Sequence, residues 1–221
     1  AYKIASMDLV NLPLIKYVGQ TQKPVLLSTG MSTIGQIDEA VEIFKSTGNK
    51  NLVLLHCNSS YPSAPEEMNL GIIKSLKKYY NIPVGLSDHT IGLLASQIAI
   101  TLGSNVIERH FTLNRTFEGP DHILSSEPKE LENLVNLTKK IPSIVGNSFK
   151  QIQPNEYQTL NQQRKSLYAK VKIKKGEVIK ENMIDIKGPG GGLLPKYIDI
   201  VIGRKATKAI EKDTPINWNN I

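Results

Sequence analysis

Two histidines that each follow a short apolar run are the residues of this chain best suited to chemistry. His89 ends the sequence SDH after the apolar run at 83–86, and His110 ends the sequence ERH after the run at 105–107. Residues 93–103, which lie between them, are mostly apolar or small and are numerous enough for one helix. This order is typical of two parallel strands joined by a helix, so the sequence predicts chemistry at both strand ends.

A pair of histidines at neighbouring strand ends could bind one metal ion. Neighbouring strands lie about 4.8 Å apart, and imidazole nitrogens bind zinc at about 2.0–2.1 Å, so both rings could reach the same ion. Asp88 and Glu108 could orient the rings or supply oxygen ligands. Because the chain contains no compact HxH or HExxH motif, two hydrogen-bonded histidines at the rim of a sheet are the alternative.

A second group of polar residues combines one cation with several hydroxyls. Its members lie in or just after predicted strands and are Lys3, Ser6, Ser28, Thr29 and Ser87. Hydroxyls and a lysine suit a phosphate or a carboxylate, where the lysine acts as a point charge. For each serine alone a turn or cap role is the alternative, and Lys3 could be only a charged residue near the chain start. Together with a metal, the group predicts a phosphorylated anionic substrate.

Three further residues could contribute to such a site. Asp121, in the loop sequence GPDH, could bind sugar hydroxyls, although an ordinary turn aspartate is the alternative. Tyr61 follows the sequence HCNSS and could form a wall of the site. Cys57 has no evident base beside it other than His56, so we do not expect a catalytic thiol.

Short apolar runs and amphipathic segments alternate over the first 141 residues. The predicted strands lie at 2–5, 24–27, 52–55, 83–86 and 105–107, and the predicted helices at 33–45, 69–80, 93–103 and 127–141. The strands lack the alternation of half-exposed strands, as expected for parallel strands covered on both faces. The order therefore predicts a parallel α/β fold.

The spacing of these units agrees with a barrel. A (β/α)₈ barrel needs about 250 residues, or about 31 per unit, so five units should occupy about 155, and the first domain ends near residue 150. We therefore predict the C-terminal five units of an eight-unit TIM barrel, with a complete five-stranded open sheet as the alternative. The chain begins directly with a strand, which indicates a start within the fold.

A change of pattern divides the chain into a barrel part at 1–146, a polar linker at 147–163 and a small β-rich domain at 164–221. In the last part, residues 166–173 alternate, 178–179 begin another predicted strand, and 208–216 complete the module after a glycine-rich loop. Its apolar residues are too few for a large core. We expect this module to dock on another surface.

Composition restricts the class of protein. The net charge is +7, but the basic residues are scattered singly or in pairs, so nucleic-acid binding is not expected. The surplus would help to steer an anionic small substrate. The one cysteine excludes an intrachain disulfide and favours the cytoplasm. No signal peptide and no apolar run of membrane-spanning length is present, so we expect no membrane association.

Six short motifs, taken together, resemble the sialic acid synthase family, which comprises the N-acetylneuraminate synthases and their legionaminate and pseudaminate relatives. They are KIAS at 3–6, LSTGM at 27–31, LLHC at 54–57, GLSDHT at 85–90, ERHFT at 108–112 and GPDH at 119–122. The resemblance continues through SLYAKVKIKKGE at 166–177 and covers essentially the whole chain. In that family the second module is a SAF, or antifreeze-like, domain.

The resemblance implies a reaction. Phosphoenolpyruvate condenses with the open-chain aldehyde of an N-acetylated amino sugar such as N-acetylmannosamine, and phosphate is released. It implies that His89 and His110 bind a divalent metal, with Mn²⁺ expected and Mg²⁺ or Co²⁺ as alternatives. The residues that match the phosphoenolpyruvate site are Lys3, Ser6, Ser28, Ser59 and Ser87. Those that match the amino-sugar site are Tyr61, Glu108 and Asp121, and the catalytic set is His89, His110, Glu108 and Asp121.

The chain departs from the family pattern at two positions. Ser59 stands where some members have asparagine, and the SAF loop reads KGPG at 187–190 where members commonly have KRPG. The family arginine, which crosses a domain-swapped homodimer to meet the acetamido group, is therefore absent, and Lys187 could replace it only as a point charge.

The family barrel begins with further strands that carry part of the active site. We therefore expect the 221 residues alone to be an incomplete, inactive enzyme. Two other classes are weighed against a synthase. One is a non-catalytic carbohydrate-binding or regulatory homologue. The presence of Lys3, His89 and His110 speaks against this class. The other is a barrel aldolase with a lysine Schiff base, for which Lys3 is the only candidate.

Overall fold

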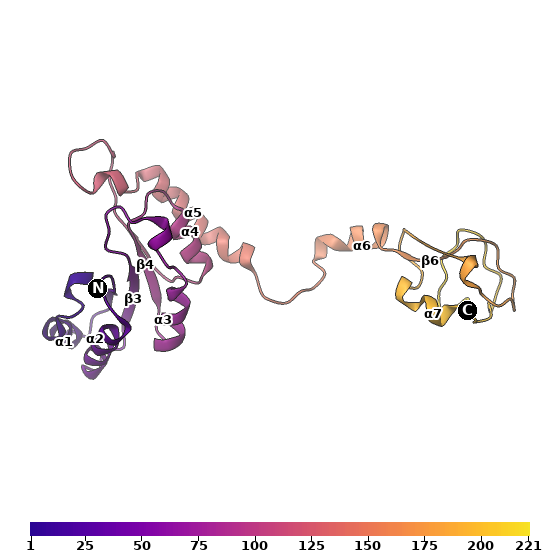
Figure 1. The fold of residues 1–221 in the computed structure, drawn as a ribbon, viewed down its shortest axis with the longest axis horizontal. Helices are drawn as coiled ribbons and strands as arrows, with labels where there is room; N and C mark the ends of the chain where they lie inside the picture. Colours follow the sequence, from indigo (N-terminus) through magenta and orange to yellow (C-terminus); the bar gives the residue numbers. More distant parts are fainter. The chain divides into compact units, whose positions relative to one another are not determined.

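The computed structural model describes residues 1–221, and the chain forms two compact units, 1–147 and 148–221 (Figure 1). Each unit has its own hydrophobic core. They are described separately below.

The first unit is built on five parallel strands that neighbour one another in chain order. They are β1 (Tyr2–Ile4), β2 (Val25–Ser28), β3 (Leu52–Cys57), β4 (Val84–Asp88) and β5 (Ile107–Arg109). This order is that of a partial TIM barrel, as predicted. Strands β2 to β5 run one to two residues further toward their carboxyl ends than the apolar runs indicated, so polar residues belong to the sheet itself, whereas β1 ends one residue earlier than predicted.

Helices follow the strands and pack against the sheet (Figure 1). They are α1 (Leu12–Gln20), α2 (Ile34–Ser46), α3 (Ile72–Tyr80), α4 (Leu94–Thr101) and α5 (Pro128–Val145). Thr33 and Gln36 form a reciprocal capping box at the start of α2. Helix α1 was not predicted, because Pro13 has the character of a helix breaker. It lies in the first turn, where no intrahelical N–H partner is needed, and Asn11 caps the helix.

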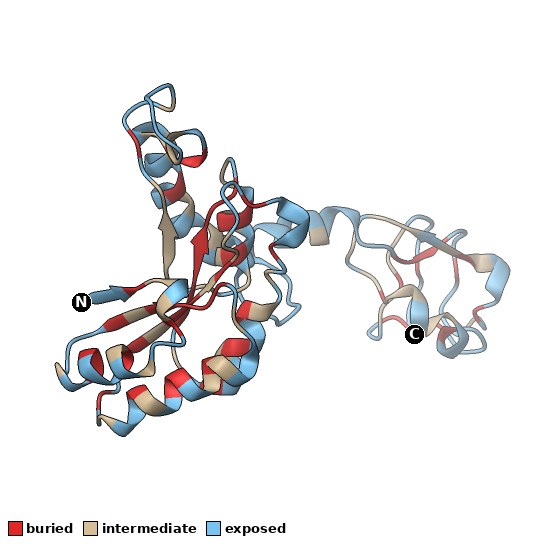
Figure 2. Ribbon diagram, turned by 60° about the vertical axis from the view of Figure 1, so that its left-hand side comes forward, coloured by how far each residue is buried: buried red, intermediate tan, exposed pale blue.

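The core of this unit lies between the strands and their helices. Leu27, Leu54 and Leu86 come from the strands, and Ile15 and Phe44 come from helices, all at most 1% exposed. Figure 2 shows the central strands as buried ribbon flanked by helices with one buried face. Every residue of β4 is buried, so this strand provides a rigid base for the side chains at its carboxyl end.

The second unit is small and mostly irregular. Its regular elements are α6 (Tyr157–Gln163), β6 (Ser166–Ala169), β7 (Ile184–Lys187) and α7 (Ile198–Val201), and β6 pairs with β7 in antiparallel fashion. Strand β7 was not predicted. The strand predicted at 178–179 forms only one isolated bridge, Val178 to Lys205. The region 208–216 likewise forms only isolated bridges. The predicted linker at 147–163 contains α6.

Short 3₁₀ helices complete both units. They lie at Ser6–Asp8, Pro65–Glu67 and His122–Leu124 in the first unit, and at Pro154–Glu156, Glu181–Met183 and Pro195–Tyr197 in the second. No helix of the structure is both long enough and apolar enough to cross a bilayer.

Candidate active site

A cavity of about 390 Å³ lies at the carboxyl ends of the parallel strands in the first unit. Strand register explains its lining, because β4 and β5 pair Ser87 with Glu108 and Asp88 with Arg109. Side chains alternate along a strand. Ser87 and Glu108 therefore face one side of the sheet, and Asp88 and Arg109 face the other. Residues predicted for the site that line this cavity are Lys3, Ser6, Ser28, Ser59, Tyr61, Ser87, His89, Glu108 and His110.

The two histidines are close and differently supported. Their ring centroids lie 5.3 Å apart, with the planes at 73°. The Nδ1–H of His89 donates to the carbonyl of Asn58 (2.7 Å), which leaves Nε2 with a free lone pair. Nδ1 of His110 lies 3.6 Å from Oδ2 of Asp121. Asp121 does not line the cavity and reaches the site through this contact.

This arrangement fits a metal bound through two imidazoles. A ligating histidine normally gives its other ring nitrogen to a carbonyl or carboxylate. The Asn58 carbonyl accepts such a bond from His89, and the Asp121 carboxylate lies near His110 at 3.6 Å, beyond hydrogen-bond distance. No group of three or more histidine, cysteine, aspartate or glutamate side chains is placed to hold an ion. Within this chain, His89 and His110 are therefore the two candidate ligands.

The carboxylates beside the histidines have other partners. Asp88 is fully buried and forms an ion pair with Arg109. Glu108 accepts a hydrogen bond from Ser87 Oγ (2.7 Å) and lies 3.5 Å from Lys3 Nζ. Neither carboxylate has a hydrogen bond to a histidine, so the prediction that they orient the rings was wrong: Asp88 faces Arg109 on the other side of the sheet, and Glu108 contacts Ser87 and Lys3. The alternative prediction, that Glu108 supplies an oxygen ligand, stays a prediction.

The hydroxyl side of the cavity contains one unsatisfied atom. Ser28 Oγ is buried and is the one buried side-chain polar atom of the chain without a hydrogen-bond partner. Ser6 Oγ accepts a hydrogen bond from the Gly30 amide (3.0 Å). A Cβ on Gly30 would lie 2.3 Å from Ser59 Oγ and 2.8 Å from Ser6 Oγ, so glycine is required for these serines to converge. Thr29 instead donates to the Leu55 carbonyl and lies outside the cavity lining.

The sequence of the chain matches two domain families. The NeuB family model matches residues 1–150, and the SAF domain model matches residues 164–221. The chain belongs to the NeuB family.

Relatives of this NeuB-family chain include named synthases. It is 40% identical to N,N'-diacetyllegionaminic acid synthase of Campylobacter jejuni, over 96% of the chain and 64% of the relative. It is 35% identical to the N-acetylneuraminate-9-phosphate synthase of Homo sapiens, over 97% of the chain and 60% of the relative. An uncharacterised protein of Methanocaldococcus jannaschii is 46% identical over the whole chain and 66% of its own length. The chain thus spans 60% to 66% of the length of these relatives.

Solved structures agree with this assignment. The N-acetylneuraminic acid (sialic acid) synthetase of Leptospira borgpetersenii, determined in complex with citrate, matches with a TM-score of 0.66 and 39% identity. The match covers 72% of this chain and 55% of that one.

Cys57 is a site residue of this NeuB-family chain that sequence reasoning did not assign. Cys57 lines the cavity, and its Sγ lies 4.0 Å from His89 Nδ1 and 3.9 Å from Ser59 Oγ. Burial raises the pKa of the thiol, but contacts with His89, Ser6 and Ser59 outweigh burial and lower it. The neighbour in sequence, His56, instead contacts the Met68 carbonyl (2.6 Å). Only the packing of β3 against β4 reveals which histidine faces the thiol.

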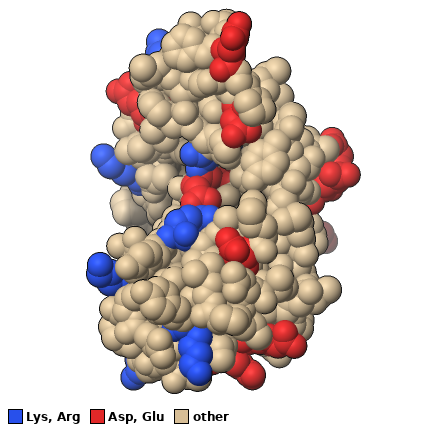
Figure 3. Space-filling view, turned by 90° about the vertical axis from the view of Figure 1, so that its left-hand side faces the viewer, with Lys and Arg blue, Asp and Glu red and all other residues tan.

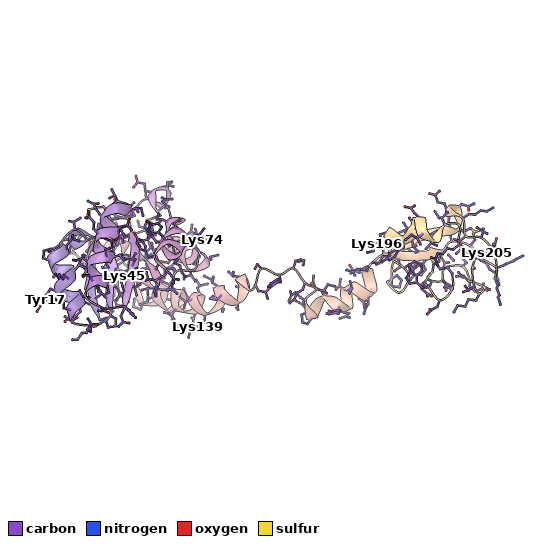
Figure 4. The ribbon with its side chains drawn as sticks, turned by 90° about the horizontal axis from the view of Figure 1, so that it is seen from below. Tyr17, Lys45, Lys74, Lys139, Lys196 and Lys205 are labelled. Atoms are coloured by element: carbon purple, nitrogen blue, oxygen red, sulfur yellow. The ribbon has the colours of Figure 1, made fainter.

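The charge surplus does not lie in the unit that contains the cavity. Residues 1–147 contain equal numbers of cationic and anionic side chains, so the surplus of +7 lies within 148–221. Figure 3 shows both signs interspersed on one face of the first unit. Figure 4 labels exposed lysines of both units, among them Lys45, Lys74 and Lys205. Local charges at the cavity therefore come from Lys3 and its neighbours.

Lys187, in the second unit, is already paired. Its ammonium donates to Asp213 and lies 3.8 Å from Asp185. Because these carboxylates neutralise it, Lys187 is not a free cation in the SAF domain.

Proposed function

We propose that this NeuB-family protein is a nonulosonic acid synthase that condenses phosphoenolpyruvate with an N-acetylated amino sugar such as N-acetylmannosamine and releases phosphate. The names of the Campylobacter and human relatives support this reaction class. The chain covers at most 66% of those relatives, so the activity is a proposal for the protein as a whole.

The single observation that carries the proposal is Ser28. An unpaired buried hydroxyl costs free energy unless a ligand satisfies it, and Ser28, whose Oγ has no partner, is one of the residues that line the cavity. Lys3, Ser59 and Ser87 line the same cavity. One ammonium and converging hydroxyls suit the phosphate or carboxylate of phosphoenolpyruvate.

The proposed chemistry balances without a redox partner. C3 of phosphoenolpyruvate forms a bond to the aldehyde carbon of the sugar, water adds at C2, and the C2–O bond breaks to release phosphate. Lys3 and the serines hold the anion and offset its charge. Glu108, held between Ser87 and Lys3, is placed to accept or return a proton.

His89 and His110 are the proposed ligands of a divalent metal, with Mn²⁺ as the first candidate. Such an ion supplies Lewis-acid polarisation of the aldehyde oxygen. The chain's part is to present both imidazoles, His89 with its Nδ1 bonded to the Asn58 carbonyl and His110 with the Asp121 carboxylate 3.6 Å from its Nδ1. The alternative to metal binding is that both histidines have only a structural role through their Nδ1 contacts. In that case their Nε2 atoms would have no role.

Tyr61, Glu108 and Asp121 are the proposed amino-sugar contacts. Legionaminate and pseudaminate synthesis are the alternative activities, since Campylobacter jejuni relatives carry both names. Because position 188 is glycine and Lys187 is paired, we propose that the loop at 187–190 contributes no free cation to sugar recognition. A domain-swapped homodimer is proposed from the family resemblance.

The test is an assay of phosphate release by the protein expressed from its complete reading frame. Phosphoenolpyruvate is offered with a panel of N-acetylated hexoses, with and without chelator. We expect release that requires a sugar and Mn²⁺. Activity unchanged by chelator would overturn the metal roles of His89 and His110, and no release with any sugar would overturn the reaction.

A further inference from the structure

One guanidinium contacts residues on both sides of His89. Nη1 of Arg109 forms an ion pair with Oδ2 of Asp88, the residue before His89. Nη2 of Arg109 donates to the carbonyl of Thr90, the residue after it (2.8 Å). The backbone that carries the first histidine is therefore held at both flanks by a side chain of the neighbouring strand.

The same guanidinium also holds the second histidine. Arg109 directly precedes His110 in the chain. Its Nε donates to Ser126 Oγ (2.8 Å), and the Ser126 amide donates to the His110 carbonyl (2.8 Å). His110 is thus linked to the group that holds His89 in two ways, directly along the chain and through Ser126 at its own carbonyl.

The contacts are buried and fully satisfied. The side chains of Arg109 and Asp88 are 3% and 0% exposed. Oδ1 of Asp88 accepts from the amide (2.9 Å) and hydroxyl (2.7 Å) of Thr90, and Oδ2 also accepts from Ser96. Such a network permits few other side-chain positions, because each alternative would leave a buried charge unpaired.

The pair does not face the cavity. Ser87, Glu108 and both histidines line it, whereas Asp88 and Arg109 do not. Alternation along paired strands puts the ion pair on the opposite side of the sheet from the lining residues. Its effect on the site must therefore pass through the backbone.

We propose that Asp88 and Arg109 are a positioning pair that sets the separation of the two cavity histidines. The inference rests on the proposed function, since the separation matters only if both imidazoles act on one ion. Neither residue touches substrate. Loss of the pair would allow the ends of β4 and β5 to shift relative to one another while the sheet below stays paired.

The experiment must separate positioning from stability. Removing one partner would leave a buried charge uncompensated, whereas an apolar pair of similar volume often preserves or raises stability. The variant is therefore Asp88→Leu/Arg109→Met, and the probe is Mn²⁺ alone, titrated by calorimetry. We expect the variant to fold with a lower unfolding temperature, because Thr90 and Ser96 lose their buried acceptor. We also expect an Mn²⁺ affinity about 10- to 100-fold weaker, the range for loss of groups that orient metal ligands.

A matched control replaces another polar pair of the same unit. Tyr80 donates to Asp38 between α3 and α2 (2.6 Å). Asp38→Leu/Tyr80→Phe should leave the Mn²⁺ affinity unchanged. If the first double variant fails to fold, Arg109→Lys takes its place. Lysine keeps the positive charge but cannot donate to Asp88, Thr90 and Ser126 at once as the guanidinium does, so this variant should also weaken Mn²⁺ binding.

Unchanged affinity in a folded variant of the pair would overturn the inference. If the unaltered protein binds no Mn²⁺, the metal part of the proposed function fails separately. The crystal structure of the folded variant then decides: a centroid separation still at 5.3 Å between His89 and His110 overturns the positioning role, and an altered one supports it.

Discussion

The phenol ring of Tyr61 lies against the imidazole of His89, with centroids 4.1 Å apart and planes tilted by 31°. Its edge also meets His110 at 5.7 Å and 77°. Burial, and then the charges of Cys57, Asp121 and Glu108, raise the pKa of Tyr61, so the phenol stays protonated. One aromatic side chain thus contacts both candidate metal ligands.

Tyr61→Ala should weaken Mn²⁺ binding, because the ring restricts both imidazoles. Aromatic pairs contribute about 0.5–1.5 kcal/mol each, so a loss of about 2- to 10-fold in affinity is expected. Tyr61→Phe keeps the ring and is the control. Equal affinities of the two variants, measured by calorimetry, would show that the ring contact has no influence on the histidines.

Ser28→Ala should separate stability from binding. Removal of a buried, unpaired hydroxyl should raise the free energy of unfolding by about 1 kcal/mol, while phosphoenolpyruvate binding weakens about 5- to 10-fold for one lost hydrogen bond. Urea unfolding and ligand titration measure the two effects. Thr29→Val is the comparison, because the Thr29 hydroxyl donates to Leu55 and its loss should destabilise the protein. A destabilised Ser28→Ala protein would contradict the assignment.

Gly30→Ala should impair the anion side of the cavity. The new Cβ would meet two serine hydroxyls at 2.3 and 2.8 Å, so Ser59 or Ser6 must move. We expect weaker phosphoenolpyruvate binding with little change in Mn²⁺ affinity. Gly35→Ala is the matched control, since nothing lies within 4 Å of its Cβ. It lies in α2 and should stabilise the protein by about 0.5–1 kcal/mol. Unchanged phosphoenolpyruvate binding by Gly30→Ala would refute the proposal that Ser6 and Ser59 must approach each other at Gly30 to bind the anion.

His56 should make stability depend on pH. Burial lowers its pKa, and the Met68 carbonyl offsets this only in part. The unfolded chain therefore takes up the proton first, so the contribution of neutral His56 is complete above about pH 6.5 and is lost as the pH falls through the folded pKa. Urea unfolding between pH 8 and 5 should show a smaller decline for His56→Gln than for the unaltered protein. Parallel curves would mean that His56 does not carry this effect.

Much of the fold follows from local patterns. Apolar runs without alternation indicated parallel strands, and amphipathic segments between them indicated covering helices. Strand ends were less certain, because polar residues such as Ser87 and Asp88 extend the strand beyond its apolar part. Helix α1 was missed because a proline in a first turn and a proline that breaks a helix have the same local sequence.

By itself the sequence determined which residues stand at neighbouring strand ends, since strand order and side-chain type are local properties. That was sufficient to bring Lys3, the serines and both histidines to one cavity. Only the tertiary structure decided their partners. It paired Asp88 with Arg109 rather than with a histidine, brought Cys57 to His89 and left Ser28 unpaired. These outcomes depend on which way each side chain faces and on contacts between residues far apart in the chain, and a shift of one residue in register would reverse them.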